Sequence, residues 1–296
     1  MNTRIKIIHH NDLDGYISGI ILKIKYPKAK CFCVNYDNYE QTFPSKNEFN
    51  KNDVVFMVDF TAQPEMMEWL KNNVDFYWID HHKSSIENSD KYGWNNIKGI
   101  RKNGLCGAEL TWQFVTKEKE IPNFIKLVGD YDTFRRSKEN YHNQTVMPFF
   151  FGTQTYMDLL KPENFENGFF HLFNDFKDEF IVNKMIERGK IIYKYIEQTG
   201  KTENNLNCYV KNIWGYRVLC MNSCGRGSNQ FTIPKTWNPQ LHDMMLIYYY
   251  NGKNWCYGFY TEKENVDVSQ IAKKYGGGGH KGAAGATTKA LINELI

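Results

Sequence analysis

Three side chains of types that bind metal ions, His10, Asp12 and Asp14, occupy alternating positions just after an apolar run over residues 5–8. In an extended backbone, residues two apart point to the same side, so these three side chains can converge on one point. Two carboxylates held that close repel each other unless a cation or a proton lies between them. The segment therefore predicts a site that binds a metal ion or shares a proton.

Two later apolar runs end in the same kinds of side chain. Asp59 follows the run 54–58, and Asp80, His81 and His82 follow the run 76–79. Polar groups at the ends of three apolar runs indicate a single site assembled at one edge of a sheet. Of the two neighbouring imidazoles, one can bind a metal ion while the other contacts or protonates a phosphate of the substrate.

The candidate ligands combine imidazoles with carboxylates and include no cysteine, a set that suits Mn²⁺ or Mg²⁺ better than structural zinc. They are His10, Asp12, Asp14, Asp59 and His81. A carboxylate that bridges two such ions would let them share a water and lower its pKa, which favours phosphoester hydrolysis near neutral pH. A capping role for aspartate would explain any one of these positions but does not explain five that converge.

Two further segments carry residues suited to the same chemistry. Asp130 and Asp132 end an apolar helical pattern, and we expect one of them to be a further ligand, although their spacing does not choose between them. Residues 276–279 are glycines followed by His280 and Lys281, and such a run can turn backbone amides inward to bind a phosphate. A flexible linker is the alternative, but small residues continue the segment in a compact pattern.

The composition is that of a folded globular protein with a nearly balanced charge. The 296 residues are 42% hydrophobic and 16% aromatic, with a formal net charge of +4. No basic stripe suited to a long duplex is evident, so we expect a short anionic ligand. No apolar run of 18 residues, no Cys-x-x-Cys pair among seven cysteines and no signal pattern occur, which predicts a cytoplasmic protein that does not bind membranes.

In the first half, short apolar runs alternate with helical patterns, which predicts an α/β fold with a mostly parallel sheet flanked by helices. The expected strands span residues 5–8, 30–34, 54–58 and 74–79, and the expected helices span 16–25, 64–71, 105–116 and 123–130. Thr61 is a candidate cap for the helix that begins at Pro64. An aromatic loop is expected over residues 141–151.

A long helix is expected from Phe176 to about Gln198, ending at Gly200, as a connector between two domains. Beyond it we expect strands over residues 216–221, 244–250 and 255–260 and a helix over 268–275. The predicted division is a metal-binding domain over 1–155, a helical connector over 156–203 and a smaller α/β domain over 204–296.

Four motifs resemble those of the DHH family of phosphoesterases. Residues 10–15 resemble its first motif, Asp59 its second, and Asp80-His81-His82 the triplet that names the family. Residues 277–285 resemble the Gly-Gly-Gly-His-x-x-Ala-Ala-Gly motif of the associated DHHA1-type C-terminal substrate domain. The resemblance, which reaches from residue 10 to residue 285, implies a two-domain enzyme with a dinuclear Mn²⁺ site.

The resemblance also implies roles for single residues. Two ions would be held by two ligand sets that share a bridging carboxylate, namely His10, Asp12 and Asp59, and Asp14, Asp59 and His81. The family's fourth-motif aspartate would fall on Asp130 or Asp132, and His82 would contact the scissile phosphate. The C-terminal motif would bind the far phosphate or the 3′ end through Gly277, Gly278, Gly279, His280 and Lys281.

The chain departs from the family in one place. Many relatives carry a Ser-x-Arg-Ser stretch before the final helix, but residues 258–261 contain no arginine. Lys281 or Arg226 would then supply the missing cation, or Tyr260 would stack on a base.

These features predict a Mn²⁺-dependent hydrolase, with Mg²⁺ as the alternative metal, that cleaves short oligonucleotides to mononucleotides. A cyclic dinucleotide or a 3′,5′-bisphosphorylated nucleotide is the alternative substrate. A non-catalytic nucleic-acid-binding relative is a further alternative, but it would lack metal ligands, and this chain retains every one expected. The sequence does not fix the oligomeric state, and a homodimer is compatible with it.

Overall fold

The structure is a computed structural model that describes residues 4–36, 38–133, 135, 141–165, 179–224 and 227–295. The chain divides into two compact units, Met1–Ile192 and Tyr193–Ile296. Each unit has its own sheet and its own buried core, so each is described by itself. The predicted α/β fold, with a parallel sheet flanked by helices and a second sheet towards the C-terminus, is confirmed.

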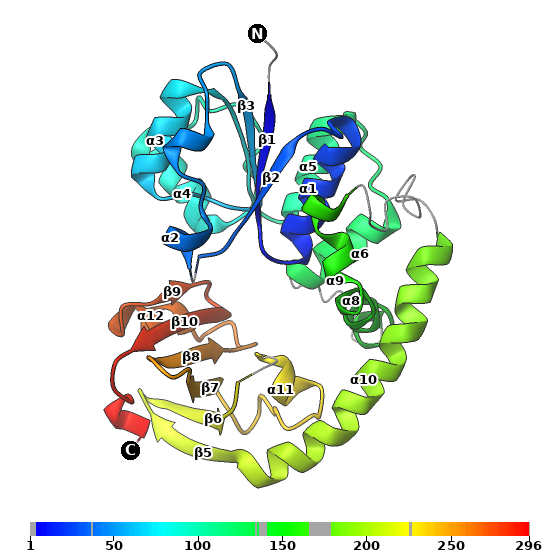
Figure 1. Cartoon of the computed structure of the whole chain (residues 1–296). Coiled ribbons are helices and arrows are strands. Elements are labelled where there is room, and N and C mark those ends of the chain that lie inside the picture. Colours follow the sequence, from blue (N-terminus) through cyan, green and yellow to red (C-terminus); the bar gives the residue numbers. More distant parts are fainter. Residues whose placement is uncertain are drawn as a thin grey trace. The chain divides into compact units, whose positions relative to one another are not determined.

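The first unit is built on a four-stranded parallel sheet in the order β2-β1-β3-β4 (Figure 1). Its strands are β1 (Ile5–His10), β2 (Lys30–Val34), β3 (Val54–Val58) and β4 (Asp75–Ile79). The strands are largely apolar because both faces of the sheet are covered. Val58 pairs with His9 on one side and Ile79 on the other, so the residues that follow these three strands meet at one edge.

Helices cover both faces of this sheet (Figure 1). One side carries α1 (Leu13–Lys25), α5 (Gly107–Thr116) and α6 (Asn123–Asp132), and the other carries α3 (Pro64–Asn73) and α4 (Lys83–Tyr92). Shorter helices are α2 (Tyr39–Thr42), α9 (Met157–Leu160) and the 3₁₀ turns Lys46–Glu48 and Pro162–Asn164. The predicted limits of the longer helices in this unit agree with the structure to within three residues.

The aromatic loop predicted over residues 141–151 is wrong. This stretch contains a π-helical turn, His142–Val146, and most of α8 (Met147–Gln154). Pro148 lies in the first turn of α8, where the missing N–H costs no helical hydrogen bond. Phe149 is fully buried, so the aromatic residues fill the core as part of a helix.

The predicted end of the long helix is also wrong. Helix α10 spans Glu179–Asn207 and continues past Gly200. A Cβ atom at Gly200 would lie 2.5 Å from Cγ of Pro234, so the glycine permits close packing and does not end the helix. The start of this prediction, residues 176–178, lies outside the described residues.

The second unit is built on a six-stranded mixed sheet in the order β5-β6-β7-β8-β10-β9. Its strands are β5 (Cys208–Ile213), β6 (Tyr216–Asn222), β7 (Met244–Tyr250), β8 (Trp255–Tyr260), β9 (Gly278–Gly279) and β10 (Ala283–Thr288). The three strands predicted here are confirmed to within one residue. Strand β10 was not predicted, because alanine and glycine rarely favour strands.

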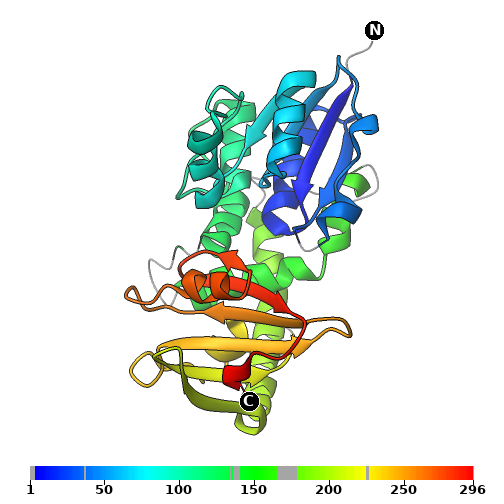
Figure 2. The same cartoon turned by 90° about the vertical axis from the view of Figure 1, so that its left-hand side faces the viewer.

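Helix α12 (Val268–Lys274) packs on β8, β9 and β10 (Figure 2). Its buried residues include Val268, Ile271 and Ala272. The remaining short helices are α11 (Asn229–Thr232) and the 3₁₀ turn Asn293–Leu295. Within the described ranges, no helix combines the length and the apolar character needed to cross a membrane.

Candidate metal centre

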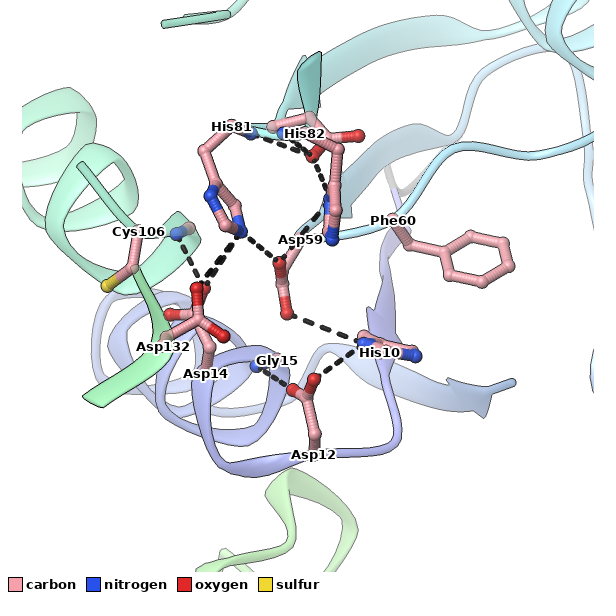
Figure 3. Close-up of polar contacts among 12 residues, drawn as sticks. His10, Asp12, Asp14, Gly15, Asp59, Phe60, His81, His82, Cys106 and Asp132 are labelled. Atoms are coloured by element: carbon pink, nitrogen blue, oxygen red, sulfur yellow. Dashed lines mark hydrogen bonds and ion pairs between the residues drawn. The ribbon is translucent and has the colours of Figure 1, made fainter. Parts of the chain in front are cut away.

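The carboxyl edge of the first unit's sheet brings most of the predicted ligands together (Figure 3). These side chains come from the ends of β1, β3 and β4, from the start of α1 and from the end of α6: His10, Asp12, Asp14, Asp59, His81, His82 and Asp132. Parallel strands in register end at the same level, so residues far apart in the sequence meet there.

The first three ligands do not lie on one extended strand, so that prediction is wrong. Strand β1 ends at His10, Asp12 is the N-cap of α1, and Asp14 lies in the first helical turn. Asp12 Oδ1 accepts the Gly15 N–H at 2.8 Å. A Cβ atom at Gly15 would lie 2.4 Å from the carbonyl oxygen of His10, so only glycine allows this tight turn. The side chains come together through a strand-to-helix turn.

The ligand atoms form two groups that a third, Asp59, His81 and His82, connects. The first of the two contains His10, Asp12 and Asp59. His10 Nδ1 lies 2.7 Å from Asp12 Oδ2 and 3.7 Å from Asp59 Oδ2. These atoms lie within 4.8 Å of one another, a spacing at which one cation can contact all three.

The second group contains Asp14, His81 and Asp132. His81 Nε2 lies 3.3 Å from Asp132 Oδ2 and 3.6 Å from Asp14 Oδ2. The same nitrogen lies 3.2 Å from Asp59 Oδ1. Asp59 therefore presents one carboxylate oxygen to each group, as Figure 3 shows.

Asp59 also has an unusual backbone. Its φ is 53°, in the left-handed region that residues other than glycine rarely adopt. Such a conformation costs of the order of 1 to 3 kcal/mol and is concentrated at functional sites. The Asp59 N–H donates to the carbonyl of Ile79 at 2.9 Å, which ties the turn to β4. A strained residue shared by both groups is more typical of a binding site than of a loop cap.

Several of these polar atoms are buried and make no well-formed hydrogen bond among the described residues, although they lie near atoms of opposite charge. They are His10 Nδ1, both carboxylate oxygens of Asp59, His81 Nε2 and Asp132 Oδ2. Each buried polar atom without a partner costs about 1 to 3 kcal/mol. A divalent cation in each group would bind these atoms, and imidazole and carboxylate are ligands that such cations accept. The residues present therefore fit a metal centre.

The pKa shifts within the two ligand groups also indicate a site for a cation. Burial and the carboxylates of Asp14 and Asp12 raise the pKa of Asp59 well above its ordinary value. Burial and the carboxylates of Asp14 and Asp59 also raise the pKa of Asp132. Burial alone would lower the pKa of His10, but Asp12 and Asp59 raise it to about 11. Without metal the site therefore holds protons, which a cation would displace.

Backbone groups of α5 hold Asp14 in place. The N–H of Gly107 donates to Asp14 Oδ2 at 2.6 Å, and the N–H of Ala108 donates to Oδ1 at 2.7 Å. A Cβ atom at Gly107 would lie 2.7 Å from Cβ of Asp59, so the helix can approach this closely only with glycine there. No motif in the sequence predicted a role for Gly107 and Ala108. The available signal was Glu109, which accepts the Cys106 N–H at the spacing of a capping box.

The two aspartates of α6 have different environments. Asp132 belongs to the second ligand group. Asp130 Oδ1 instead accepts from Arg135 Nε at 2.9 Å, and the same guanidinium pairs with Glu109 through two contacts of 2.9 Å. The structure therefore brings Asp132 to the other ligands and holds Asp130 away from them.

Asp80 positions His82 and lies outside both ligand groups. Its Oδ1 contacts His82 Nδ1 at 2.7 Å and accepts the N–H groups of His81 and His82. Thr61 Oγ1 donates to Asp80 Oδ2 at 2.6 Å. Thr61 is therefore not the cap of α3, since Gln63 holds the N-cap position. Burial would lower the pKa of His82, but Asp80 raises it to about 9.

The glycine-rich segment folds as a hairpin of β9 and β10 in the second unit. The His280 N–H donates to the Ala283 carbonyl at 2.7 Å, and the Ala283 N–H donates back at 3.2 Å. A Cβ atom at Gly277 would lie 2.0 Å from the carbonyl oxygen of Gly285. Gly279 has a φ of 138°. Packing of the hairpin itself therefore requires both of these glycines.

Four of the five predicted substrate-binding residues of this hairpin are exposed, namely Gly278, Gly279, His280 and Lys281, and Gly277 is half-buried. Tyr260, the predicted stacking residue, is half-buried on β8, and Arg226 lies outside the described residues. The role of these side chains in substrate binding stays a prediction.

Comparisons with known proteins give a matching family model and a similar curated protein. Residues 4–130 match the family model described as DHH family, N-terminal domain. The oligoribonuclease NrnB of Bacillus subtilis (strain 168) is 26% identical to this chain, and the match covers 97% of the chain and 73% of the relative.

Two solved structures share the fold. The pGpG-specific phosphodiesterase PggH from Vibrio cholerae has a TM-score of 0.55 at 12% identity, with 97% of this chain and 94% of that chain covered. The exonuclease RecJ bound to manganese has a TM-score of 0.50 at 14% identity, with 96% and 86% covered.

The family match and the similarity to NrnB over nearly the whole chain place this protein in the class of metal-dependent phosphoesterases. Within this class, its residues 4–130 are similar to the N-terminal domain of the DHH family.

Proposed function

We propose that this protein hydrolyses phosphodiester bonds in short oligonucleotides and releases mononucleotides, with Mn²⁺ as its metal and Mg²⁺ as the alternative. Two named relatives, an oligoribonuclease and a pGpG-specific phosphodiesterase, support a small oligonucleotide as the substrate. The nearly balanced charge of the chain, +4 over 296 residues, also favours a short ligand over a long duplex.

One observation carries the proposal. Asp59 is buried in a strained backbone conformation and directs Oδ2 towards His10 and Oδ1 towards His81, and both oxygens lack a hydrogen-bond partner in the described part of the chain. A carboxylate shared by two groups in this way is suited to bridge two cations. A structural capping aspartate would instead accept hydrogen bonds from backbone N–H groups.

The proposed ligands of the first ion are His10, Asp12 and Asp59, and those of the second are Asp14, Asp59, His81 and Asp132. When bound, the two cations would lower the pKa of water and neutralise charge on the phosphate oxygens.

The chain's own residues then orient these groups and the substrate. The N–H groups of Gly107 and Ala108 fix the carboxylate of Asp14. Asp80 fixes the ring of His82 and favours its protonated form, so His82 is suited to donate a hydrogen bond to a phosphate oxygen of the substrate. Burial of Asp59 and Asp14 limits the water that competes for these contacts.

Initial hydrolysis rates on a panel of substrates test the proposal. The panel holds RNA and DNA of two to about ten nucleotides, a cyclic dinucleotide and a 3′,5′-bisphosphorylated adenosine, each with Mn²⁺, Mg²⁺ or EDTA. We expect mononucleotide release from the shortest linear oligonucleotides, fastest with Mn²⁺ and absent with EDTA. If the cyclic or bisphosphorylated substrate is hydrolysed faster, that compound becomes the proposed substrate. If none of the compounds in the panel is hydrolysed, the proposed activity is contradicted.

Two variants control for the site. Asp59→Asn removes the shared charge and should reduce the rate by roughly 10³-fold or more. Asp75→Asn changes an exposed carboxylate at the start of β4, paired with Lys98, and should leave the rate within about twofold.

A further inference from the structure

A cavity of about 290 Å³ opens beside the metal centre, within the first unit. Asp12, Asp14 and Asp132 form part of its wall, so the cavity adjoins both ligand groups. Its volume is near the lower end of the range for small-molecule sites. A space of this size suits one nucleoside better than a longer segment of a polymer.

The rest of the wall is largely apolar and aromatic. Leu13, Val128 and Met157 contribute apolar surface. Tyr131 and Phe150 stack with their ring centroids 3.6 Å apart and their planes 9° apart. Nucleobases bind to such surfaces by stacking and by burial of their faces.

Two carboxamide side chains, Asn11 and Gln154, also line this cavity. Asn11 Oδ1 accepts from the hydroxyl of Tyr16 and the thiol of Cys33, which leaves the Asn11 amide N–H groups without a partner among the described residues. Gln154, at the end of α8, is exposed like Asn11, and its side chain makes no hydrogen bond in the same described ranges. Carboxamides supply the donor and acceptor groups that recognise the edges of bases.

We propose that this cavity binds the base of the nucleotide whose phosphate lies at the metal centre. The base packs beside Tyr131 and Phe150, and Asn11 and Gln154 hydrogen-bond its edge. This inference rests on the proposed function and adds what the site recognises, namely a nucleobase as well as a phosphodiester. It follows that a phosphodiester without bases is a poor substrate.

Hydrolysis rates on a dinucleotide and on its analogue without bases distinguish base recognition from recognition of the phosphodiester alone. The wild-type protein should prefer the dinucleotide in kcat/KM by roughly 5- to 150-fold, the range expected for one stacked base. Gln154→Trp fills the cavity and should bring this preference close to one. Gln154→Ala removes only the carboxamide and should reduce the preference in part.

Leu159→Trp is the matched control. Leu159 lies on α9, is 42% exposed and does not line the cavity, so this variant should keep the wild-type preference. Thermal unfolding of all variants with Mn²⁺ bound checks that each is folded. Equal rates of the wild-type protein on both substrates, or an unchanged preference in Gln154→Trp, would overturn the inference.

A binding measurement keeps the inference separate from the proposed function. The fluorescence of a dinucleotide containing 2-aminopurine should be quenched by the wild-type protein and by Leu159→Trp in Mg²⁺, but not by Gln154→Trp. If no substrate is hydrolysed and this pattern still appears, the proposed function fails and the base-binding cavity stands. If the wild-type protein gives no quenching, the cavity does not bind a base.

Discussion

The metal centre of the first unit and the glycine-rich hairpin of the second unit are built in opposite ways. In the metal centre Asp14 and Asp59 are buried and the other ligand side chains are partly buried, and several of their polar atoms lack a hydrogen-bond partner within the described residues. In the hairpin the backbone groups of His280 and Ala283 bond to each other, and Gly277 and Gly279 serve the packing of the strands.

Because of this difference, the two motifs are unequal as evidence for a bound ligand. The metal centre is energetically incomplete on its own, because buried carboxylates repel one another and a cation relieves that repulsion. In the hairpin, folding alone explains Gly277 and Gly279 before any ligand is considered, whereas it does not require Gly278. Substitutions made in each region therefore test whether the metal centre needs a cation and whether the hairpin glycines serve packing.

The largest expected effect separates the two aspartates of α6. Asp132→Asn should reduce kcat by roughly 10²- to 10³-fold, because it removes a charge from the second ligand group. Asp130→Asn should stay within about tenfold, because Asp130 pairs with Arg135 outside both groups. Rates measured over a series of Mn²⁺ concentrations compare the two. Equal losses would contradict the assignment of Asp132.

A smaller effect is expected from a methyl group added at each region. Gly107→Ala places a Cβ atom 2.7 Å from Cβ of Asp59 and 3.0 Å from Asp14 Oδ2, so it should displace these ligands and weaken Mn²⁺ binding by roughly 10- to 100-fold. Gly278→Ala meets no atom within 4 Å and should leave Mn²⁺ affinity unchanged. Titration calorimetry measures both affinities. An unchanged affinity in Gly107→Ala would show that the α5 contact does not position the ligands.

Within the hairpin, alanine substitutions at two neighbouring glycines should differ in their effect on the stability of the fold. Gly277→Ala should destabilise the fold by about 1 to 3 kcal/mol, because the added Cβ atom would lie 2.0 Å from the carbonyl oxygen of Gly285. Gly278→Ala should change stability by less than about 0.5 kcal/mol. Denaturant unfolding measures the difference. Equal stabilities would mean that the glycines are present for a ligand and not for packing.

The smallest effect concerns pH. Despite burial, Asp80 raises the pKa of His82 to about 9, and Asp12 and Asp59 raise that of His10 to about 11. A histidine with a raised folded-state pKa stabilises the fold below its unfolded value of about 6.5, and this contribution is lost as the pH rises through the folded pKa. The Tm of the metal-free protein should fall by several degrees between about pH 6.5 and 9. With Mn²⁺ bound the fall should be smaller, because the cation replaces the protons. Equal slopes in EDTA and in Mn²⁺ would contradict this.

The strands and most helices could be predicted because their patterns are local. The runs at β3 and β7 are apolar or aromatic from end to end, and those at β2 and β8 depart from this only at Lys30 and Gly258, so composition marks their limits. The helical character of residues 141–151 could not be predicted, because proline and aromatic residues also occur in loops and burial of Phe149 depends on distant parts of the chain. The continuation of α10 past Gly200 likewise depends on Pro234.

The candidate site was predictable in its residue types but not in its geometry. The spacing of His10, Asp12 and Asp14 suggested an extended strand, whereas Asp12 caps a helix and still lies beside His10. The choice between Asp130 and Asp132 depends on Arg135, which no local pattern connects to them. The contacts of α5 with Asp14 join segments more than ninety residues apart, and the capping-box spacing of Cys106 and Glu109 marks only the start of α5.

The central claim is that Asp59 bridges two cations, and the most direct test is the number of Mn²⁺ ions bound per chain. Equilibrium dialysis with elemental analysis should find two ions on the wild-type protein and on Asp75→Asn. Asp59→Asn should bind at most one, with weaker affinity, while remaining folded. One ion or none on the wild-type protein, or two ions bound to Asp59→Asn with unchanged affinity, would contradict the account.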